Sequence, residues 1–153
     1  MNKKIKILIL IFFFNFLFIN NTLSDKKDYF LTLKYNEVKV RQGPSFEYPV
    51  KFVYKKRYLP VKIVDSKDNF KKIIDLKNND GWIHTSQLTK KKSAINISNL
   101  SVAFKKPSIY SQPLARLEKG KMVIIKKCAN EWCKISVQNN QFWIQKKFLW
   151  GKF

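Results

Sequence analysis

The stretch Val38-Lys-Val-Arg-Gln-Gly-Pro-Ser45 decides the fold, because a related stretch, Val102-Ala-Phe-Lys-Lys-Pro-Ser108, occurs later in the chain. Each stretch is followed by a closing aromatic segment, Gly81-Trp-Ile83 after the first and Phe142-Trp-Ile144 after the second. The two copies are about sixty residues apart, and a repeat of that length indicates that one small structural unit has been duplicated.

The residues around both stretches predict an all-β fold. Short runs that alternate or are rich in β-branched residues, such as Glu37–Arg41 and Val50–Tyr54, are typical of strands, and no long segment keeps a helical period. A tight hairpin turn is expected at Asn78-Asn79-Asp80-Gly81, with its positive φ at Asp80-Gly81, and a single 3₁₀ turn is expected at Thr85–Leu88. A unit of about 50–60 residues is too small for a flat sheet with a core, so each is expected to curl into a small barrel.

The first 24 residues have the layout of a secretory signal peptide. A basic segment, Asn2–Lys6, precedes an apolar run from Ile7 to Ile19, and Thr22 and Ser24 place small residues before a cut. Cleavage is therefore expected after Ser24, with no stable membrane span in the cleaved protein. The alternative is an uncleaved membrane anchor, which requires roughly 20 apolar residues, more than this run contains.

The first unit carries the residues of a known family. Together they resemble bacterial SH3 domains, above all those of exported proteobacterial proteins that carry two such domains behind a signal peptide. The residues that carry the resemblance are Val38–Arg41, Gly43-Pro44-Ser45, Tyr48-Pro49-Val50 and Gly81-Trp82-Ile83. The resemblance implies small SH3-like β-barrels that bind cell-wall peptides or envelope proteins and have no enzyme activity.

The second unit resembles the family less closely. Lys105-Lys106 replaces the Arg-x-Gly of the first unit, and Phe142 replaces its closing glycine. The expected organisation is two SH3-like β-barrels in tandem behind a signal peptide. Its expected bounds are 1–24 for the signal peptide, 25–90 for the first barrel, 91–99 for a linker and 100–153 for the second, divergent barrel.

Cys128 and Cys133 are the only cysteines, and a Cys-x₄-Cys segment of this kind is often found in the second domain of the proteins resembled. An even count in an exported protein favours a disulfide. The alternatives are a metal site, which needs more ligands than the sole histidine, His84, and a redox pair, which usually has a shorter spacing. We expect a structural disulfide, no metal and no cofactor.

Aromatic side chains gather in the first half of the first unit, beside an arginine. Aromatic-lined grooves offer peptides a large contact area at a low cost in rotamer entropy. The expected ligand-binding residues are Arg41, Tyr48, Tyr54 and Trp82. The alternative is that the aromatic residues belong to the barrel core and that Arg41 pairs with Glu37 or Glu47.

The chain has a formal net charge of +21, of which the lysines of the first 24 residues contribute three. Such a charge attracts polyanions, so electrostatic binding to an anionic surface, either lipid headgroups or nucleic acid, is the alternative function. Nucleic acid is disfavoured as a partner because the chain has only three Arg, the residue that base recognition uses most. The coding bias of an AT-rich genome explains the Lys excess equally well.

No catalytic residue is expected, because the sequence shows no nucleophile–base pair, no Gly-rich phosphate loop and no acidic metal cluster. The expected function is that of a non-enzymatic exported binding module, located in the periplasm or cell envelope. Its expected partner is a cell-wall peptide or an envelope protein, with an anionic polymer as the alternative. A third interpretation is an accessory subunit of a cell-wall hydrolase.

Overall fold

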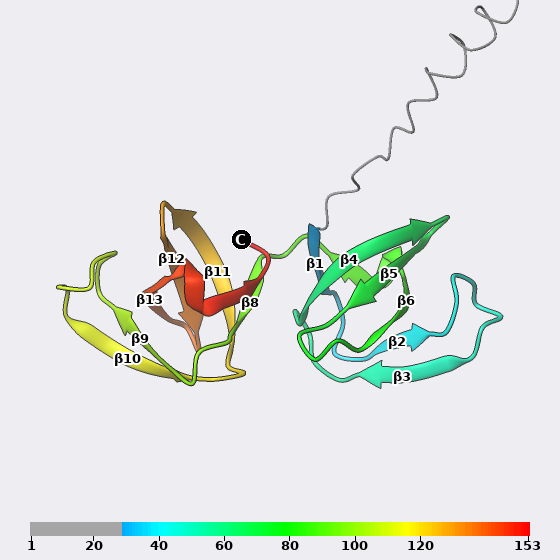
Figure 1. Ribbon diagram of the computed structural model, residues 1–153, viewed down its shortest axis with the longest axis horizontal. Coiled ribbons are helices and arrows are strands. Elements are labelled where there is room, and N and C mark those ends of the chain that lie inside the picture. Colours follow the sequence, from blue (N-terminus) through cyan, green and yellow to red (C-terminus); the bar gives the residue numbers. More distant parts are fainter. Residues whose placement is uncertain (1–28) are drawn as a thin grey trace, which may run out of the picture.

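The computed structural model describes residues 29–153 as two antiparallel sheets of seven strands each (Figure 1). The expected signal peptide and its cleavage point lie outside the described residues. The first sheet contains β1 (Tyr29–Leu33), β2 (Val38–Arg41), β3 (Val50–Tyr54), β4 (Pro60–Lys67), β5 (Phe70–Ile74), β6 (Asp80–His84) and β7 (Leu88–Thr89). The second contains β8 (Ser93–Asn96), β9 (Leu100–Phe104), β10 (Pro113–Glu118), β11 (Met122–Ala129), β12 (Trp132–Val137), β13 (Asn140–Gln145) and β14 (Leu149–Gly151).

The two sheets have the same topology, which confirms two SH3-like units in tandem. The strand order is β3-β2-β6-β5-β4-β1-β7 in the first and β10-β9-β13-β12-β11-β8-β14 in the second. A 3₁₀ turn precedes the last strand of each sheet, η1 (Thr85–Gln87) and η2 (Lys146–Phe148). The first of these confirms the expected 3₁₀ turn.

Strand pairing fixes which residues of the two barrels are equivalent. Arg41 lies opposite Trp82 in the first sheet, and Phe104 lies opposite Trp143 in the second. The loop between β2 and β3 is closed by a hydrogen bond from the Gln42 N–H to the Pro49 carbonyl. The loop between β9 and β10 is closed in the same way by a bond from the Lys105 N–H to the Gln112 carbonyl. Both loops have eight residues, 42–49 and 105–112, so they can be compared position by position.

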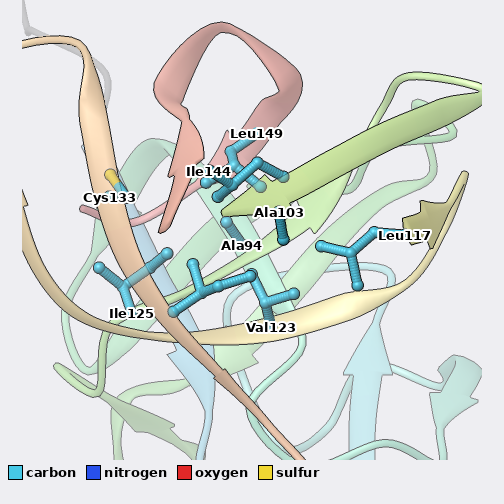
Figure 2. Close-up of a cluster of buried hydrophobic side chains, with 9 residues drawn as sticks. Ala94, Ala103, Leu117, Val123, Ile125, Cys133, Ile144 and Leu149 are labelled. Atoms are coloured by element: carbon cyan, nitrogen blue, oxygen red, sulfur yellow. The ribbon is translucent and has the colours of Figure 1, made fainter. Parts of the chain in front are cut away.

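The alternation of side chains along the strands builds the two cores. On β2, Val38 and Val40 are fully buried while Lys39 between them is exposed, as the sequence predicts. The first core consists of Leu33, Val38, Val40, Val61, Ile63, Ile73, Ile83 and Leu88. The second consists of Ala94, Ala103, Leu117, Val123, Ile125, Cys133, Ile135, Ile144 and Leu149 (Figure 2).

The segment expected to be a linker contains a strand. Residues 93–96 form β8, which pairs with β11 and β14, so the second sheet begins at Ser93 and not at residue 100. All four residues of β8 are buried. The side-chain amide of Asn96 donates to the carbonyls of Leu117 and Glu118. Polar residues that are buried and hydrogen-bonded remove the apolar alternation by which a strand is recognised in a sequence.

The turn expected over residues 78–81 is present, but its left-handed residue is Asn78 and not Asp80 or Gly81. Asn78 takes the left-handed conformation with φ of 63°, and Asp80 and Gly81 are already in β6. Gly81 is required for a different reason, because a Cβ there would overlap the side chain of Val40 and approach the Arg41 carbonyl oxygen to 3.0 Å. The glycine thus permits close packing of β6 against β2.

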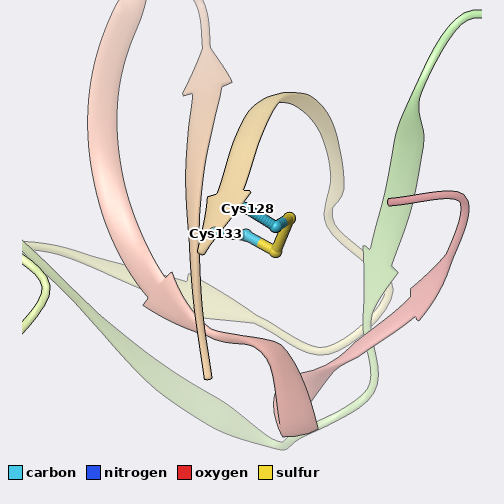
Figure 3. The surroundings of a disulfide bond; sticks show 2 residues. All are labelled: Cys128 and Cys133. Carbon is cyan, nitrogen blue, oxygen red and sulfur yellow. A yellow bond between two sulfur atoms is a disulfide. The ribbon is translucent and has the colours of Figure 1, made fainter. Parts of the chain in front are cut away.

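The two cysteines form a disulfide, as expected (Figure 3). Cys128 and Cys133 lie directly opposite each other on β11 and β12, close to the turn that joins these strands. The Cys133 side chain is fully buried in the second core. The bond therefore cross-links the two strands of the β11–β12 hairpin, and its Cys133 end lies in the core.

The contact between the barrels includes an aromatic pair and several hydrogen bonds from side chains to backbone carbonyls. The rings of Phe30 and Trp150 meet edge to face with centroids 4.9 Å apart. Lys152 Nζ donates to the Phe30 carbonyl at 3.1 Å, and the Thr32 hydroxyl donates to the Lys91 carbonyl at 2.9 Å. Burial, with the nearby charges of Lys90 and Lys92, lowers the pKa of Lys152. Within residues 29–153 no helix is long and apolar enough to cross a membrane.

Removal of the disulfide should destabilise the protein by a modest amount. The loop that it closes is short, so a Cys128→Ala/Cys133→Ala variant should unfold with a free energy lower by about 2 kcal/mol. Urea unfolding of the wild type with and without reductant, beside the double variant, measures this difference. Equal stability of the oxidised and reduced wild type would contradict the prediction, and reductant should have no effect on the variant.

Candidate functional site

The outward surface of β2, β5 and β6 carries a cluster of aromatic and cationic side chains. Since the inward positions of these strands fill the core, the alternate positions face away from it. Trp82 lies between the buried Gly81 and Ile83 and directly opposite Arg41 and Lys72. With the loop 42–49, this surface forms what we call the first face: Arg41, Phe46, Tyr48, Phe70, Trp82 and His84.

Phe46 anchors the loop on the strands. Its ring centroid lies 5.1 Å from that of Phe70 and 5.0 Å from that of His84. The Arg41 guanidinium lies 5.4 Å from the Phe46 ring, within the range of a cation–π contact. Phe46 nevertheless remains 61% exposed, so the loop covers Phe70 and still presents an aromatic ring to solvent.

Arg41 holds the loop through backbone carbonyls. Its Nη1 donates to the carbonyl oxygens of Phe46 at 3.0 Å and Tyr48 at 2.7 Å. The alternative partners expected from the sequence, Glu37 and Glu47, form no ion pair with Arg41 in the described part of the chain. Because both bonds use Nη1, the remaining N–H groups of the guanidinium are free of partners within residues 29–153, and they can donate to a ligand.

Tyr48 depends on Gly43. A Cβ at Gly43 would lie 2.6 Å from atoms of the Tyr48 ring, so only glycine allows the ring to lie against the chain there. The Tyr48 side chain is 47% exposed. The structure thus brings together three of the four expected ligand-binding residues, Arg41, Tyr48 and Trp82.

The fourth, Tyr54, lies elsewhere. It stands opposite Val38, at the other end of the β2–β3 pair from Arg41, and its hydroxyl donates to Asp75 Oδ2 at 2.9 Å. Burial, followed by the hydrogen bond to Asp75, raises the pKa of Tyr54. Burial also opposes ionisation of Asp75, but hydrogen bonds from Asn79, Tyr54 and the Lys77 N–H outweigh it and lower the pKa of Asp75. Tyr54 therefore supports the fold.

Two members of the first face, Phe70 and His84, were not among the expected ligand-binding residues. They lie directly opposite each other on β5 and β6, with ring centroids 5.0 Å apart. His84 Nδ1 lies 2.7 Å from the Ser86 hydroxyl and accepts a hydrogen bond from the Ser86 N–H at 3.3 Å, so it caps the 3₁₀ turn η1. In the described residues no group of three or more His, Cys, Asp or Glu side chains could hold a metal ion.

The equivalent surface of the second barrel, the second face, has different chemistry. Phe104 replaces Arg41, Trp132 replaces Phe70, and the Phe104 and Trp132 rings meet edge to face at 5.7 Å. Lys127 Nζ lies 5.7 Å from the Trp143 ring. Lys134 stands opposite both Lys127 and Trp143. The second face is therefore aromatic and basic, without an arginine that holds the loop.

A duplicated, curled seven-stranded sheet with an aromatic outward face defines a tandem SH3-like protein. The chain belongs to the bacterial SH3 domain family, whose model matches residues 34–90 and again residues 98–151. No curated protein gives a significant sequence match to it.

Solved structures from Trichomonas vaginalis and Bacillus cereus are among those similar to this chain. The structure of NlpC2 from Trichomonas vaginalis is 16% identical, with a TM-score of 0.37 over 83% of this chain and 49% of that chain. The structure of NlpC1 from the same organism is also 16% identical, with a TM-score of 0.37 over 86% of this chain and 48% of that chain. An NlpC/P60 family protein from Bacillus cereus ATCC 10987 is 12% identical, with a TM-score of 0.35 over 79% of this chain and 55% of that chain. The chain thus spans about half the length of these proteins.

Replacement of Tyr54 by Phe should reduce stability and leave ligand binding unchanged. The Tyr54→Phe variant removes a hydrogen bond to an ionised carboxylate, which contributes about 1.5–3 kcal/mol. The pKa of Asp75 is lower in the fold than in the unfolded chain, so its stabilising contribution is present at neutral pH and is lost as the pH falls below about 4. Urea unfolding should therefore show a lower free energy of unfolding for the variant than for the wild type at pH 7, and a smaller difference between the two at pH 3.

The matched control is Tyr48→Phe, which removes a hydroxyl from an exposed ring and should leave stability unchanged. A Tyr54→Phe variant as stable as wild type at pH 7 would show that the bond to Asp75 does not stabilise the barrel.

Proposed function

We propose that this protein is a non-enzymatic, exported binding module whose ligand is a cell-envelope component, either a peptidoglycan peptide or an envelope protein. Membership of the bacterial SH3 domain family over both units supports a binding module. The observation that carries the proposal is the first face, where Arg41, Tyr48 and Trp82 lie together on the outside of the barrel.

The first face is suited to peptide binding for physical reasons. Phe46 and Trp82 offer flat apolar area, and a ring loses little rotamer entropy on binding. Arg41 holds the loop before a ligand arrives, so that binding does not have to order it. Its remaining N–H groups can pair with a peptide carboxylate, for which the guanidinium geometry is well matched.

Export is supported by two independent features. The first 24 residues have the layout of a signal peptide. The Cys128–Cys133 disulfide belongs in an oxidising compartment such as the periplasm or the outer envelope.

Intact-mass analysis of the protein recovered from the envelope fraction of an expressing bacterium tests export directly. The mass should correspond to a chain that begins at Asp25 with its disulfide formed. A chain that still begins at Met1 would contradict cleavage, and free thiols would contradict passage through an oxidising compartment.

The second candidate function is electrostatic binding to an anionic surface. It is favoured by the second face, where Lys127 and Lys134 flank Trp143 and no acidic side chain within residues 29–153 pairs with either lysine. A surface of this kind would bind lipid headgroups or anionic polymers through charge, and its affinity would fall steeply with salt.

Retention on bacterial envelope preparations tests the proposed function. We expect the wild type at 150 mM salt to sediment with crude envelopes, and a Tyr48→Ala/Trp82→Ala variant to be retained about tenfold less, because central aromatic residues dominate such interfaces. Tyr35→Ala is the matched control, since Tyr35 is equally exposed in the same barrel but lies outside the first face. Sacculi stripped of protein separate the two ligand classes, because only a peptidoglycan ligand survives that treatment.

Three results would count against the proposal. The first is no retention of the wild type on either preparation. The second is equal loss of retention in the Tyr35→Ala control. The third is retention by wild type and variant alike that disappears between about 50 and 200 mM salt, which favours the electrostatic candidate.

A further inference from the structure

An open groove lies on the second barrel, between the outward side of β9–β10 and the loop 105–112. Its volume is about 630 Å³. The lining is mostly apolar and includes Val102, Phe104, Ile109 and Leu114, with Arg116 at its rim. Figure 1 shows β9 and β10 at the end of the molecule that is far from the first barrel, so that barrel does not cover the groove.

The groove exists because three positions differ between the barrels. Arg41, which holds the loop of the first barrel, is replaced by Phe104, which cannot donate to loop carbonyls. Phe46, which packs on Phe70, is replaced by the smaller Ile109, which is 56% exposed.

The third difference is at the bulge of the edge strand. Both edge strands have a register shift at their start, so that Lys51 and Leu114 occupy the same place. Lys51 forms an ion pair with Asp80 at 2.6 Å, whereas Leu114 lines the groove and is 45% exposed. The apolar side chain at this position therefore faces the groove.

The loop beside the groove has its own internal support. The Lys106 N–H donates to the Ser111 hydroxyl at 3.0 Å, and the Tyr110 N–H donates to the Ser108 hydroxyl at 3.2 Å. These bonds replace the arginine of the first barrel and leave the space in front of Phe104 open. The groove is thus present before a ligand binds, which lowers the cost of binding.

The charge around the groove selects an acidic ligand. Lys105 and Lys106 line a second pocket that shares Ser111 with the groove. Residues 91–153 contain 13 Lys and Arg but only two acidic residues, Glu118 and Glu131, neither of which lines either pocket. A cationic rim around an apolar floor favours a ligand with carboxylates beside an apolar group.

The position of β10 favours an extended chain as the occupant. β10 is the outermost strand of its sheet, so the groove is open along one side. A polypeptide laid along this edge in extended form would direct alternate side chains toward the groove. An acidic glycan or a lipid headgroup would pair with the cations but would leave the apolar floor unfilled.

We propose that this groove docks an extended acidic protein segment that places one bulky apolar side chain between Ile109 and Leu114, with its carboxylates at Arg116 and Lys105-Lys106. The assignment rests on the proposed function and narrows it, because it makes the ligand of the second barrel an envelope protein. The loop 42–49 of the first face and the loop 105–112 beside the groove lie at opposite ends of the molecule (Figure 1).

Fluorescence anisotropy with two labelled peptides tests the groove. The probes are Asp-Glu-Asp-Leu-Asp-Glu-Asp and the same peptide with Ser in place of Leu, measured at 150 mM salt. The wild type should bind the Leu probe at least about fivefold more tightly than the Ser probe, because only the Leu side chain can fill the apolar floor. The Leu114→Glu substitution should weaken binding of the Leu probe at least about tenfold, because it places a carboxylate next to an acidic ligand.

The matched control is Val53→Glu, which places the same charge on an exposed valine of the other edge strand. It should leave binding of the Leu probe unchanged. Ile109→Glu is a second groove variant at an exposed position and should repeat the effect of Leu114→Glu. Circular dichroism and thermal unfolding confirm that each variant is folded.

Equal affinity for the two probes would overturn the assignment and indicate attraction by charge alone. The same conclusion would follow if Val53→Glu weakened binding of the Leu probe as much as Leu114→Glu does. Binding to phosphatidylglycerol vesicles that competes with the Leu probe and is unchanged in Leu114→Glu would overturn it as well. Envelope retention without a preference for the Leu probe refutes the groove and leaves the proposed function standing. A clear preference for the Leu probe without envelope retention refutes the proposed function and leaves the groove standing.

Discussion

The alternation of side chains across a single curled sheet governs this protein. Each barrel has one sheet, and the inward side chains of that sheet must form the whole core, eight residues in the first barrel and nine in the second. Ligand recognition is therefore confined to the outward positions and to the loops that lie over them. Trp82 and Trp143 are outward because their neighbours Ile83 and Ile144 are fully buried. The positions of the first face and the second face follow from the register of the core.

The duplication preserves the inside and changes the outside. Ile83 and Ile144 occupy equivalent buried places, and Val40 and Ala103 are both fully buried. On the outward side, Arg41 becomes Phe104 at the same point in the pairing. That change removes the side chain that holds the loop and leaves an apolar floor in its place. Because the core does not depend on outward residues, one barrel could gain a groove without loss of its fold.

Signals that are local in the sequence predicted the structure well. The alternation at Val38–Arg41 and the short spacing of the cysteines each depend on neighbouring residues alone, and both led to the observed strand and disulfide. The strand β8 was missed because its polar residues are buried against partners distant in the chain, as with Ser93, whose hydroxyl donates to the Tyr58 carbonyl. Tyr54 was grouped with Tyr48 because they are close in sequence, but Tyr48 lies in the loop before β3 and Tyr54 lies at the far end of that strand.

Lysines at the contact between the barrels are directed at neutral groups. Both barrels carry a net positive charge, and their contact includes the Phe30–Trp150 ring pair. Lys152 donates to a carbonyl oxygen, and Lys91 Nζ lies 5.9 Å from the Tyr58 ring. Cations satisfied in this way need no acidic partner from the other barrel, and salt weakens the remaining repulsion. Arg116 lines the groove, and Lys105 and Lys106 line the pocket next to it. The loop 105–112 lies at the end of the second barrel that is far from the first (Figure 1), so charge there can act on an anionic partner.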